Sequence, residues 1–172
     1  MGLEKEIIQE NKELQYLQNK LEQTHFDLYR NVDKETLSQS FQNATEVEPE
    51  FFKIALQESI ALIGDAHTYV PSFSDKEFLP IECKEIKGSY YITGSSDKHK
   101  SLIGSEIIGI NNTKIENIIP KVSRLSSKEN SEVFLHDMAN YIPSNRVLRY
   151  YGFSNNKTPK ITTPKGQYEV GR

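Results

Sequence analysis

A short turn sequence, Gly64–Thr68, separates two parts of the chain that have different hydrophobic patterns. Before it, apolar residues recur at helical spacing and end in the largely apolar run 51–63. After it, short β-prone stretches alternate with turn sequences. Glycine adopts the left-handed backbone that commonly ends a helix, so we expect Gly64 to terminate the last of the amino-terminal helices. The pattern predicts an α+β protein with its helices first and its β-rich part second.

Three helices are predicted before the turn. The first covers residues 3–24, in which one stripe at helical spacing is formed by Leu3, Ile7, Leu14, Leu17 and Leu21. This helix packs on its own domain or, alternatively, acts as a coiled-coil or partner-binding helix. Asp33 is placed to cap a second helix, and Pro49 suits the first turn of a third.

Short strands dominate the part after the turn. They are predicted over residues 66–73, 78–86, 89–93 and 106–110. Turn sequences follow two of them, at Lys87-Gly88 and at Asn111-Asn112. Two further strands flank Pro164–Gly166, which predicts a terminal hairpin.

Helices are also predicted between these strands. One covers residues 115–125, with Pro120 as a kink or a limit, and a second covers 128–140, with Ser127 as its cap. Residues 146–153 are aromatic-rich and fit either a helix or irregular structure.

Composition excludes several classes of function. The 172 residues suit one domain or two small ones, and the net charge of -3 offers no basic field for nucleic acid. No apolar run is long enough to span a membrane. Cys83 is the only cysteine, so neither an intrachain disulfide nor a cysteine-based zinc site is expected. Three histidines without metal-ligand spacing are interpreted as surface or packing residues: His25, His99 and His136. We therefore expect no metal and no cofactor.

His67 is the candidate catalytic residue. Imidazole titrates near neutral pH, so a histidine held on a turn suits a general base, although it also suits an ordinary surface position. Asp65 either binds backbone N–H groups of the loop or pairs with the His67 ring. Thr68 is expected to bond back across the turn.

Two segments resemble a known family. Gly64-Asp65-Ala66-His67-Thr68 resembles the Gly-Asp-x-His-Thr/Ser signature of serine peptidases of the tail-specific (C-terminal processing) and tricorn-core family. Gly104–Asn112 resembles the PDZ-type segment Gly-Asp-x-Ile-x-x-Ile-Asn-Gly of that family, with Ser105 in place of its Asp and Asn112 in place of its last Gly. The resemblance covers roughly residues 25–160.

The resemblance implies a specific architecture. It indicates an amino-terminal three-helix unit over residues 1–75, which ends in the Gly64–Thr68 turn. A small PDZ-like β-rich unit with flanking helices would follow over 76–153. The terminal hairpin, 154–172, would lead toward a carboxy-terminal catalytic domain that this chain does not contain.

The resemblance also implies a function. The chain would be the non-catalytic front part of a bacterial serine endopeptidase that is secreted or at the cell surface, with the cytoplasm as an alternative location. His67 would be the general base toward a serine in the later domain, supported by Gly64, Asp65 and Thr68. In the branch of the family that uses a lysine as the base, His67 would be structural.

The PDZ-like unit would handle a protein or peptide substrate. Its candidate peptide-binding residues are Leu102, Ile103 and Gly104. The alternative from a different functional class is a peptide- or protein-binding module with no catalytic role.

Overall fold

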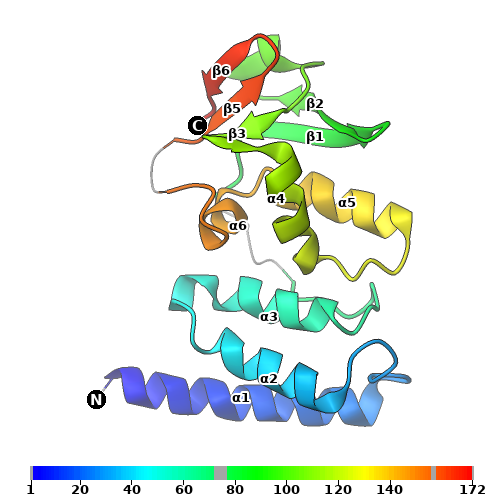
Figure 1. Ribbon diagram of the computed structural model, residues 1–172. Helices are drawn as coiled ribbons and strands as arrows, with labels where there is room; N and C mark the ends of the chain where they lie inside the picture. Colours follow the sequence, from blue (N-terminus) through cyan, green and yellow to red (C-terminus); the bar gives the residue numbers. More distant parts are fainter. Residues whose placement is uncertain (1, 72–76, 156–157, 172) are drawn as a thin grey trace.

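The amino-terminal part of the protein is a stack of helices. The computed structural model describes residues 2–71, 77–155 and 158–171, with the backbone alone for residues 2–11. The stack lies at one end of the molecule (Figure 1) and consists of α1 (Gly2–Thr24), α2 (Lys34–Ala44), the short 3-10 helix η1 (Pro49–Phe51) and α3 (Phe52–Ala61). The Asp33 carboxylate accepts a hydrogen bond from the Thr36 N–H at 2.8 Å, which confirms the predicted cap of α2.

The described part of α1 packs on its own protein. Leu14 is buried, and Leu17 and Leu21 pack against the same hydrophobic core. The Gln18 side chain donates to Ser38 Oγ on α2 at 2.7 Å. The first of the two predicted roles of this helix is therefore confirmed for these residues, whereas the side chains of Leu3 and Ile7 lie outside the described residues.

The β-rich part contains two small antiparallel sheets. One is the hairpin of β1 (Ile81–Ile86) and β2 (Ser89–Ser95). The other has the strand order β4-β3-β5-β6 and consists of β3 (Gly109–Ile110), β4 (Thr113–Lys114), β5 (Lys160–Thr163) and β6 (Gly166–Glu169). The predicted terminal hairpin is confirmed, and β5 pairs with β3 within this sheet. The α+β class predicted from the sequence is therefore confirmed.

The turn between β1 and β2 lies where the sequence predicts it. Lys87 and Gly88 both have positive φ, 54° and 88°, as a two-residue hairpin turn of the primed type requires. The chain after β2 returns along the other side of this strand. Ile92 donates its N–H to the Ser105 carbonyl, and Ile107 donates to the Tyr90 carbonyl. This returning segment connects the two sheets.

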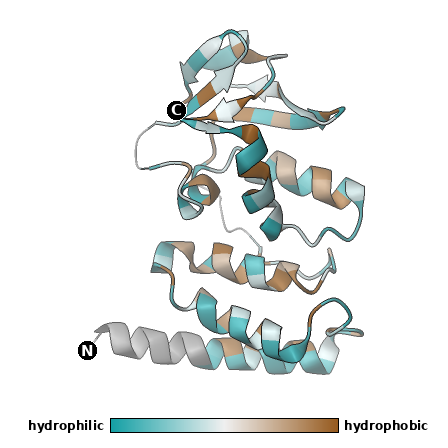
Figure 2. Ribbon diagram, viewed as in Figure 1, coloured by the Kyte–Doolittle hydropathy of each residue, from teal (hydrophilic) through white to brown (hydrophobic). Residues whose placement is uncertain are grey.

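Five helical elements make up the described remainder of this part. They are the 3-10 helices η2 (Asp97–Leu102) and η3 (Ser123–Leu125), together with α4 (Ile115–Val122), α5 (Ser131–Tyr141) and α6 (Asn145–Tyr150). Figure 1 shows α4, α5 and α6 between the sheets and the helical stack. Hydrophobic residues are more frequent on α3 and α5 than on α2, which is mostly hydrophilic (Figure 2). The buried residues form one cluster that runs through both parts of the chain.

Two local predictions are wrong. The described part of the predicted strand 66–73 is a turn followed by irregular chain up to residue 71, and its remainder lies outside the described residues. Val70 donates its N–H to the Gln57 side chain at 2.7 Å instead of to a neighbouring strand. Ser127 does not cap α5. Asn130 caps it instead, because its side-chain oxygen accepts a hydrogen bond from the Val133 N–H. Lys128, in the preceding loop, has a positive φ of 55°.

Polar contacts join the two parts, and one of them is buried. Gln57 of α3 donates to the Leu125 carbonyl at 2.8 Å, and Glu58 binds Arg124 at 2.6 Å. Arg149 of α6 binds both Glu50 and Glu77. None of the helices in the described ranges is long and apolar enough to cross a membrane.

Candidate functional site

The Gly64–Thr68 loop begins at a position that only glycine fits. Gly64 has a φ of +77° and donates its N–H to the Ala61 carbonyl, which ends α3 as predicted. Asn31, from the connection between α1 and α2, donates its side-chain amide to the Ile63 carbonyl at 2.9 Å. A Cβ at Gly64 would lie 2.4 Å from Asn31 Nδ2. Both the backbone conformation and the close approach of Asn31 therefore require glycine here.

Asp65 organises the loop. One carboxylate oxygen accepts from the His67 N–H at 2.9 Å, and the other accepts from Thr68 Oγ1 at 2.7 Å. The carboxylate thus binds the loop itself, not the His67 ring, which is the first of the two roles predicted for it. The hydrogen bond from Thr68, followed by those from the His67 N–H and His25, holds the pKa of Asp65 below its ordinary value.

His25 is the imidazole that contacts Asp65. Its Nε2 lies 3.2 Å from Asp65 Oδ2, and its Nδ1 accepts from the Asp27 N–H at 3.2 Å. With Nδ1 accepting this bond, Nε2 is the ring nitrogen that donates to Asp65. His25 therefore ties the connection between α1 and α2 to the loop.

A third segment reaches the loop from the chain between η3 and α5. Glu129 Oε2 accepts a hydrogen bond from the Ala66 N–H at 2.9 Å. Together with the contacts of Asn31 and His25, this bond fixes the loop from two sides of the molecule. The loop is therefore a structural joint: hydrogen bonds from the helical stack and from the β-rich part both hold it in place.

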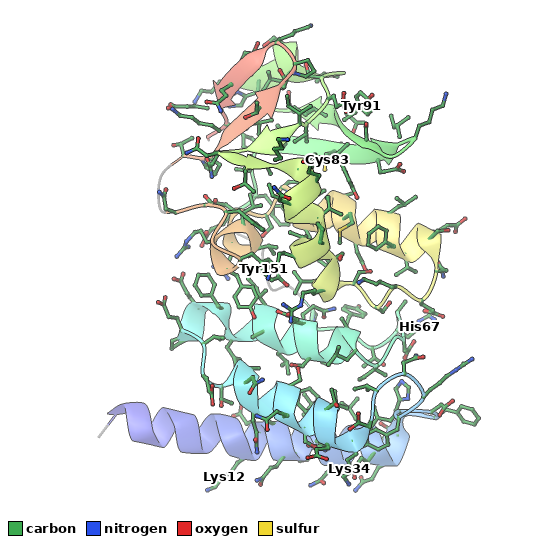
Figure 3. The ribbon with its side chains drawn as sticks, viewed as in Figure 1. Lys12, Lys34, His67, Cys83, Tyr91 and Tyr151 are labelled. Atoms are coloured by element: carbon green, nitrogen blue, oxygen red, sulfur yellow. The ribbon has the colours of Figure 1, made fainter. Side chains whose placement is uncertain are left out.

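His67 points away from these contacts. Its side chain is exposed and makes no hydrogen bond or ion pair with the residues that the structure describes. Figure 3 shows it at the edge of the molecule, beside the loop. Its backbone is fixed by Asp65 while its ring remains accessible to solvent. The catalytic role of His67 stays a prediction.

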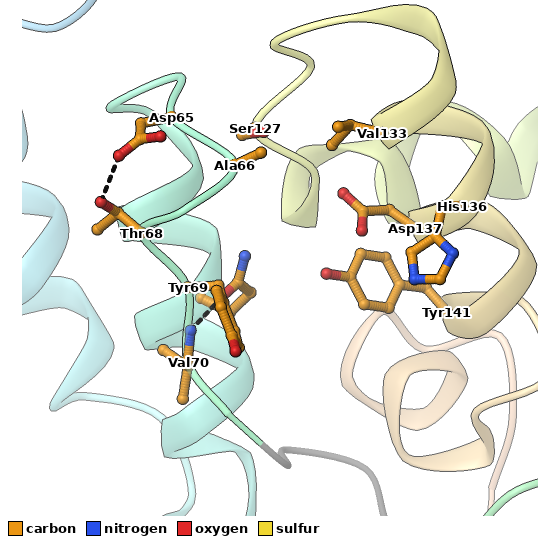
Figure 4. Close-up of a pocket in the computed structure, with 11 residues that line it drawn as sticks. Asp65, Ala66, Thr68, Tyr69, Val70, Ser127, Val133, His136, Asp137 and Tyr141 are labelled. Atoms are coloured by element: carbon orange, nitrogen blue, oxygen red, sulfur yellow. Dashed lines mark hydrogen bonds between the residues drawn. The ribbon is translucent and has the colours of Figure 1, made fainter.

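A cavity of about 230 Å³ lies beside the loop (Figure 4). Asp65, Thr68 and Tyr69 lie on one side of it, and Asp137 and Tyr141 of α5 lie on the other. Burial raises the pKa of Asp137, although a hydrogen bond from Ser126 at 2.7 Å opposes the shift. His67 does not line this cavity.

A larger groove of about 590 Å³ lies between α4, α5 and the β1–β2 hairpin. Its apolar walls come from Ile115, Ile119, Phe134 and Leu135, with Ile107 contributing to the lining beside them. The remaining lining residues are Glu85, Gly88, Ser89, Tyr90, Glu106, Glu116, Pro120 and Ser131. This groove has a more extensive apolar lining than the cavity beside the loop.

The three predicted peptide-binding residues do not line this groove. Leu102 is buried, and the Gly104 N–H is bonded to the Ile92 carbonyl at 2.8 Å. Ile103 is 48% exposed on the surface nearby. These three residues therefore lie along the edge of β2, where the Gly104 N–H is already bonded to the strand, and Ile103 is the exposed apolar side chain among them.

Sequence reasoning missed the residues that hold the loop. His25, Asn31 and Glu129 contact it across sequence separations of 40, 32 and 63 residues. No spacing rule connects such positions, and only an alignment that showed paired changes could have found them. The described residues include no group of three or more His, Cys, Asp or Glu that could hold a metal ion.

Comparisons with known proteins identify no relative of this chain. No family model matches the chain, and neither the curated proteins nor the solved structures contain a significant match. The function is therefore inferred from the geometry of the chain and from its two motifs.

Proposed function

We propose that this chain is a peptide-binding module and that the groove between α4 and α5 is its binding site. The observation that carries this proposal is the apolar recess that the folded chain leaves uncovered. Recesses of this size, with apolar walls and a few polar groups, are the usual form of a binding site in proteins.

The walls of the groove suit short apolar segments. Ile115 and Ile119 of α4 face Phe134 and Leu135 of α5, and Leu135 is 37% exposed. Burial of apolar surface contributes about 25 cal/mol per Å², so two or three apolar side chains of a peptide would supply most of the affinity. Ile118 anchors α4 in the core and Met138 anchors α5, and both are fully buried, so the recess is preformed.

The resemblance to a PDZ-type segment supports the same conclusion. Glu106 and Ile107 belong to the segment 104–112 that carries the resemblance, and both line the groove. The small antiparallel sheets with flanking helices are compatible with a PDZ-like unit. We propose that the unit presents a protein or peptide substrate in this groove.

A matched pair of variants tests the location of the site. The probe is an acetylated and amidated peptide with a Ser-Ile-Leu-Phe-Ser core and a fluorescent label, and its anisotropy is measured during titration. Leu135→Ser should weaken binding about tenfold, since one buried apolar contact is worth 1 to 2 kcal/mol, roughly. Ile103→Ser removes a similarly exposed apolar side chain outside the groove and should leave affinity unchanged.

Two outcomes would contradict the proposal. If wild-type protein does not bind the probe at any accessible concentration, the groove is not a peptide site of this class. If Ile103→Ser weakens binding and Leu135→Ser does not, the site lies at Leu102–Gly104, as predicted from the resemblance.

A second function is favoured by the position of His67. An exposed imidazole on a braced loop is accessible to a serine supplied by another domain, for which it would act as general base. On this proposal the chain is the front part of a serine endopeptidase and is inert alone. A fluorophosphonate probe should not label the chain, and stoichiometric labelling would show that it carries its own activated serine.

A further inference from the structure

We infer that the groove selects peptides in which the apolar residues are flanked by lysine or arginine, and that it disfavours a free carboxy terminus. This inference rests on the proposed function, because it names the class of peptide that the same groove would bind. It is carried by the distribution of charge around the groove.

Among the residues that line the groove, only glutamates carry a formal charge at neutral pH. Glu85 comes from β1, Glu106 from the segment that returns along β2, and Glu116 from α4. No lysine, arginine or histidine is among the lining residues. Three separate segments thus bring negative charge to the rim of one apolar recess.

Two of the three carboxylates already have partners. Glu85 accepts a hydrogen bond from the Gly88 N–H, and Glu116 binds Lys114 at 3.3 Å on an exposed side of α4. Glu106 is half-buried and makes no ion pair or side-chain hydrogen bond with the described residues. Glu106 is therefore the carboxylate best placed to accept a cation from a bound peptide.

Charge at the edge of an apolar recess acts mainly on selectivity. The apolar walls lower the local dielectric constant, so a carboxylate attracts a cationic group more strongly there than it would on an open surface. It repels an anionic group by the same physics, and like charges brought together suppress the wrong partner. The glycine N–H on the wall, that of Gly88, already donates to Glu85 and offers no site for a peptide carboxylate.

The same charges exclude other occupants. Phosphates of nucleic acids and anionic lipid headgroups would be repelled by the glutamates that line the groove. A volume of about 590 Å³ accommodates a few side chains and not an extended polymer face. A short peptide with apolar residues between basic ones satisfies both the walls and the rim.

Three peptides with one apolar core test the selectivity. Each contains Ile-Leu-Phe, flanked on both sides by lysine, by serine or by glutamate, and the first two are acetylated and amidated while the third keeps a free carboxy terminus. The lysine peptide should bind at least tenfold more tightly than the glutamate peptide at low salt, with the serine peptide between them. This ratio should fall as the ionic strength rises, because salt screens exposed charges.

Charge-neutralising variants identify the residues responsible. Glu106→Gln should lower the preference for the lysine peptide over the serine peptide about threefold or more, and Glu116→Gln should lower it less, because Lys114 already pairs with Glu116. Glu46→Gln is the matched control, since Glu46 is exposed on the connection after α2 and does not line the groove. Circular dichroism establishes that the variants fold.

The outcomes separate the two proposals. Equal binding of all three peptides would overturn the charge selectivity and leave peptide binding in place. Binding of none of them would overturn the proposed function and the inference with it. An unchanged preference in folded Glu106→Gln and Glu116→Gln proteins would show that these carboxylates do not select the peptide.

Discussion

The Gly64–Thr68 loop and the α4–α5 groove differ in how completely their chemical groups are satisfied within the molecule. In the loop, the Asp65 carboxylate binds Thr68, the His67 backbone and His25, while Glu129 binds the Ala66 N–H. In the groove, apolar side chains such as Leu135 stay uncovered. The loop therefore looks like a structural joint, and the groove has the open surface that a binding partner would cover.

The loop and the groove therefore have different roles: the loop maintains the backbone structure, and the groove offers a surface for binding. The recognisable motif Gly-Asp-x-His-Thr specifies a backbone conformation, through the positive φ of Gly64 and the turn around Asp65. The groove depends on side chains from α4, α5 and the β1–β2 hairpin, which no single motif contains. A variant in the loop should therefore change stability, whereas a variant in the groove should change affinity.

The largest expected effect is that of Gly64→Ala. The new Cβ would displace Asn31 from the Ile63 carbonyl and would place alanine at a φ of +77°. The left-handed backbone costs an L-residue about 1 kcal/mol, and the lost hydrogen bond costs roughly another 1 to 2 kcal/mol. We expect the free energy of unfolding, measured with urea, to fall by about 2 to 3 kcal/mol.

Gly104→Ala is the control for this variant. Gly104 also has a positive φ, +82°, but a Cβ there would meet nothing within 4 Å. The free energy of unfolding should fall by about 1 kcal/mol, from the backbone term alone. Equal losses in the two variants would show that the close approach of Asn31 contributes nothing to stability.

An intermediate effect with a defined pH dependence is expected for Asp65→Asn. The folded-state pKa of Asp65 is lowered, so its carboxylate stabilises the fold at pH values above the ordinary pKa of about 4, and this contribution is lost as the pH falls through the lowered value. The wild type should exceed the variant by about 1 kcal/mol at neutral pH, and the difference should disappear in acid.

Thermal or urea unfolding from neutral pH to about pH 3 measures this difference. Asp27→Asn provides the control, because the Asp27 carboxylate is exposed and makes no side-chain hydrogen bond with the described residues. A difference between wild type and Asp65→Asn that does not change with pH would mean that ionisation of Asp65 does not stabilise the loop.

Much of the fold could be predicted because its signals are local. Asp33 caps α2, Lys87 and Gly88 turn the first hairpin, and the sequence around Pro164–Gly166 forms the last one. Each depends on residues within four positions of one another, so the sequence contains the whole cause.

The two wrong predictions have different physical causes. The alternation in residues 66–73 is typical of a strand, but Gln57 takes the Val70 N–H and Asp65 folds the start of the segment into a turn. Ser127 and Asn130 are both good cap residues, and their identities alone do not show which of them ends the preceding loop. A tertiary contact with Gln57 contributed to the first case, whereas the cap of α5 was decided locally, by the hydrogen bond from the Val133 N–H to Asn130.

The candidate site was predictable only in part, because several of its contacts join distant residues. The sequence indicated the turn at Gly64 and the role of Asp65 in the loop, because both act within a few residues. The contacts of His25 and Asn31 with the loop, and the meeting of α4 with α5, join residues far apart in the chain. Periodicity and spacing contain no information about such pairs.

The smallest expected effect is that of His67→Ala. The His67 ring is exposed and contacts no described partner, so the free energy of unfolding should change by about 0.5 kcal/mol or less. A loss above 1 kcal/mol, roughly, would give the ring a structural role in the loop and weaken its case as a catalytic base. A negligible loss would show that stability does not require the His67 side chain. Its removal could then be tested on peptide hydrolysis, in a polypeptide that carries the serine domain, without a confounding change in folding. Loss of hydrolysis there would support the proposed general-base role, and unchanged hydrolysis would contradict it.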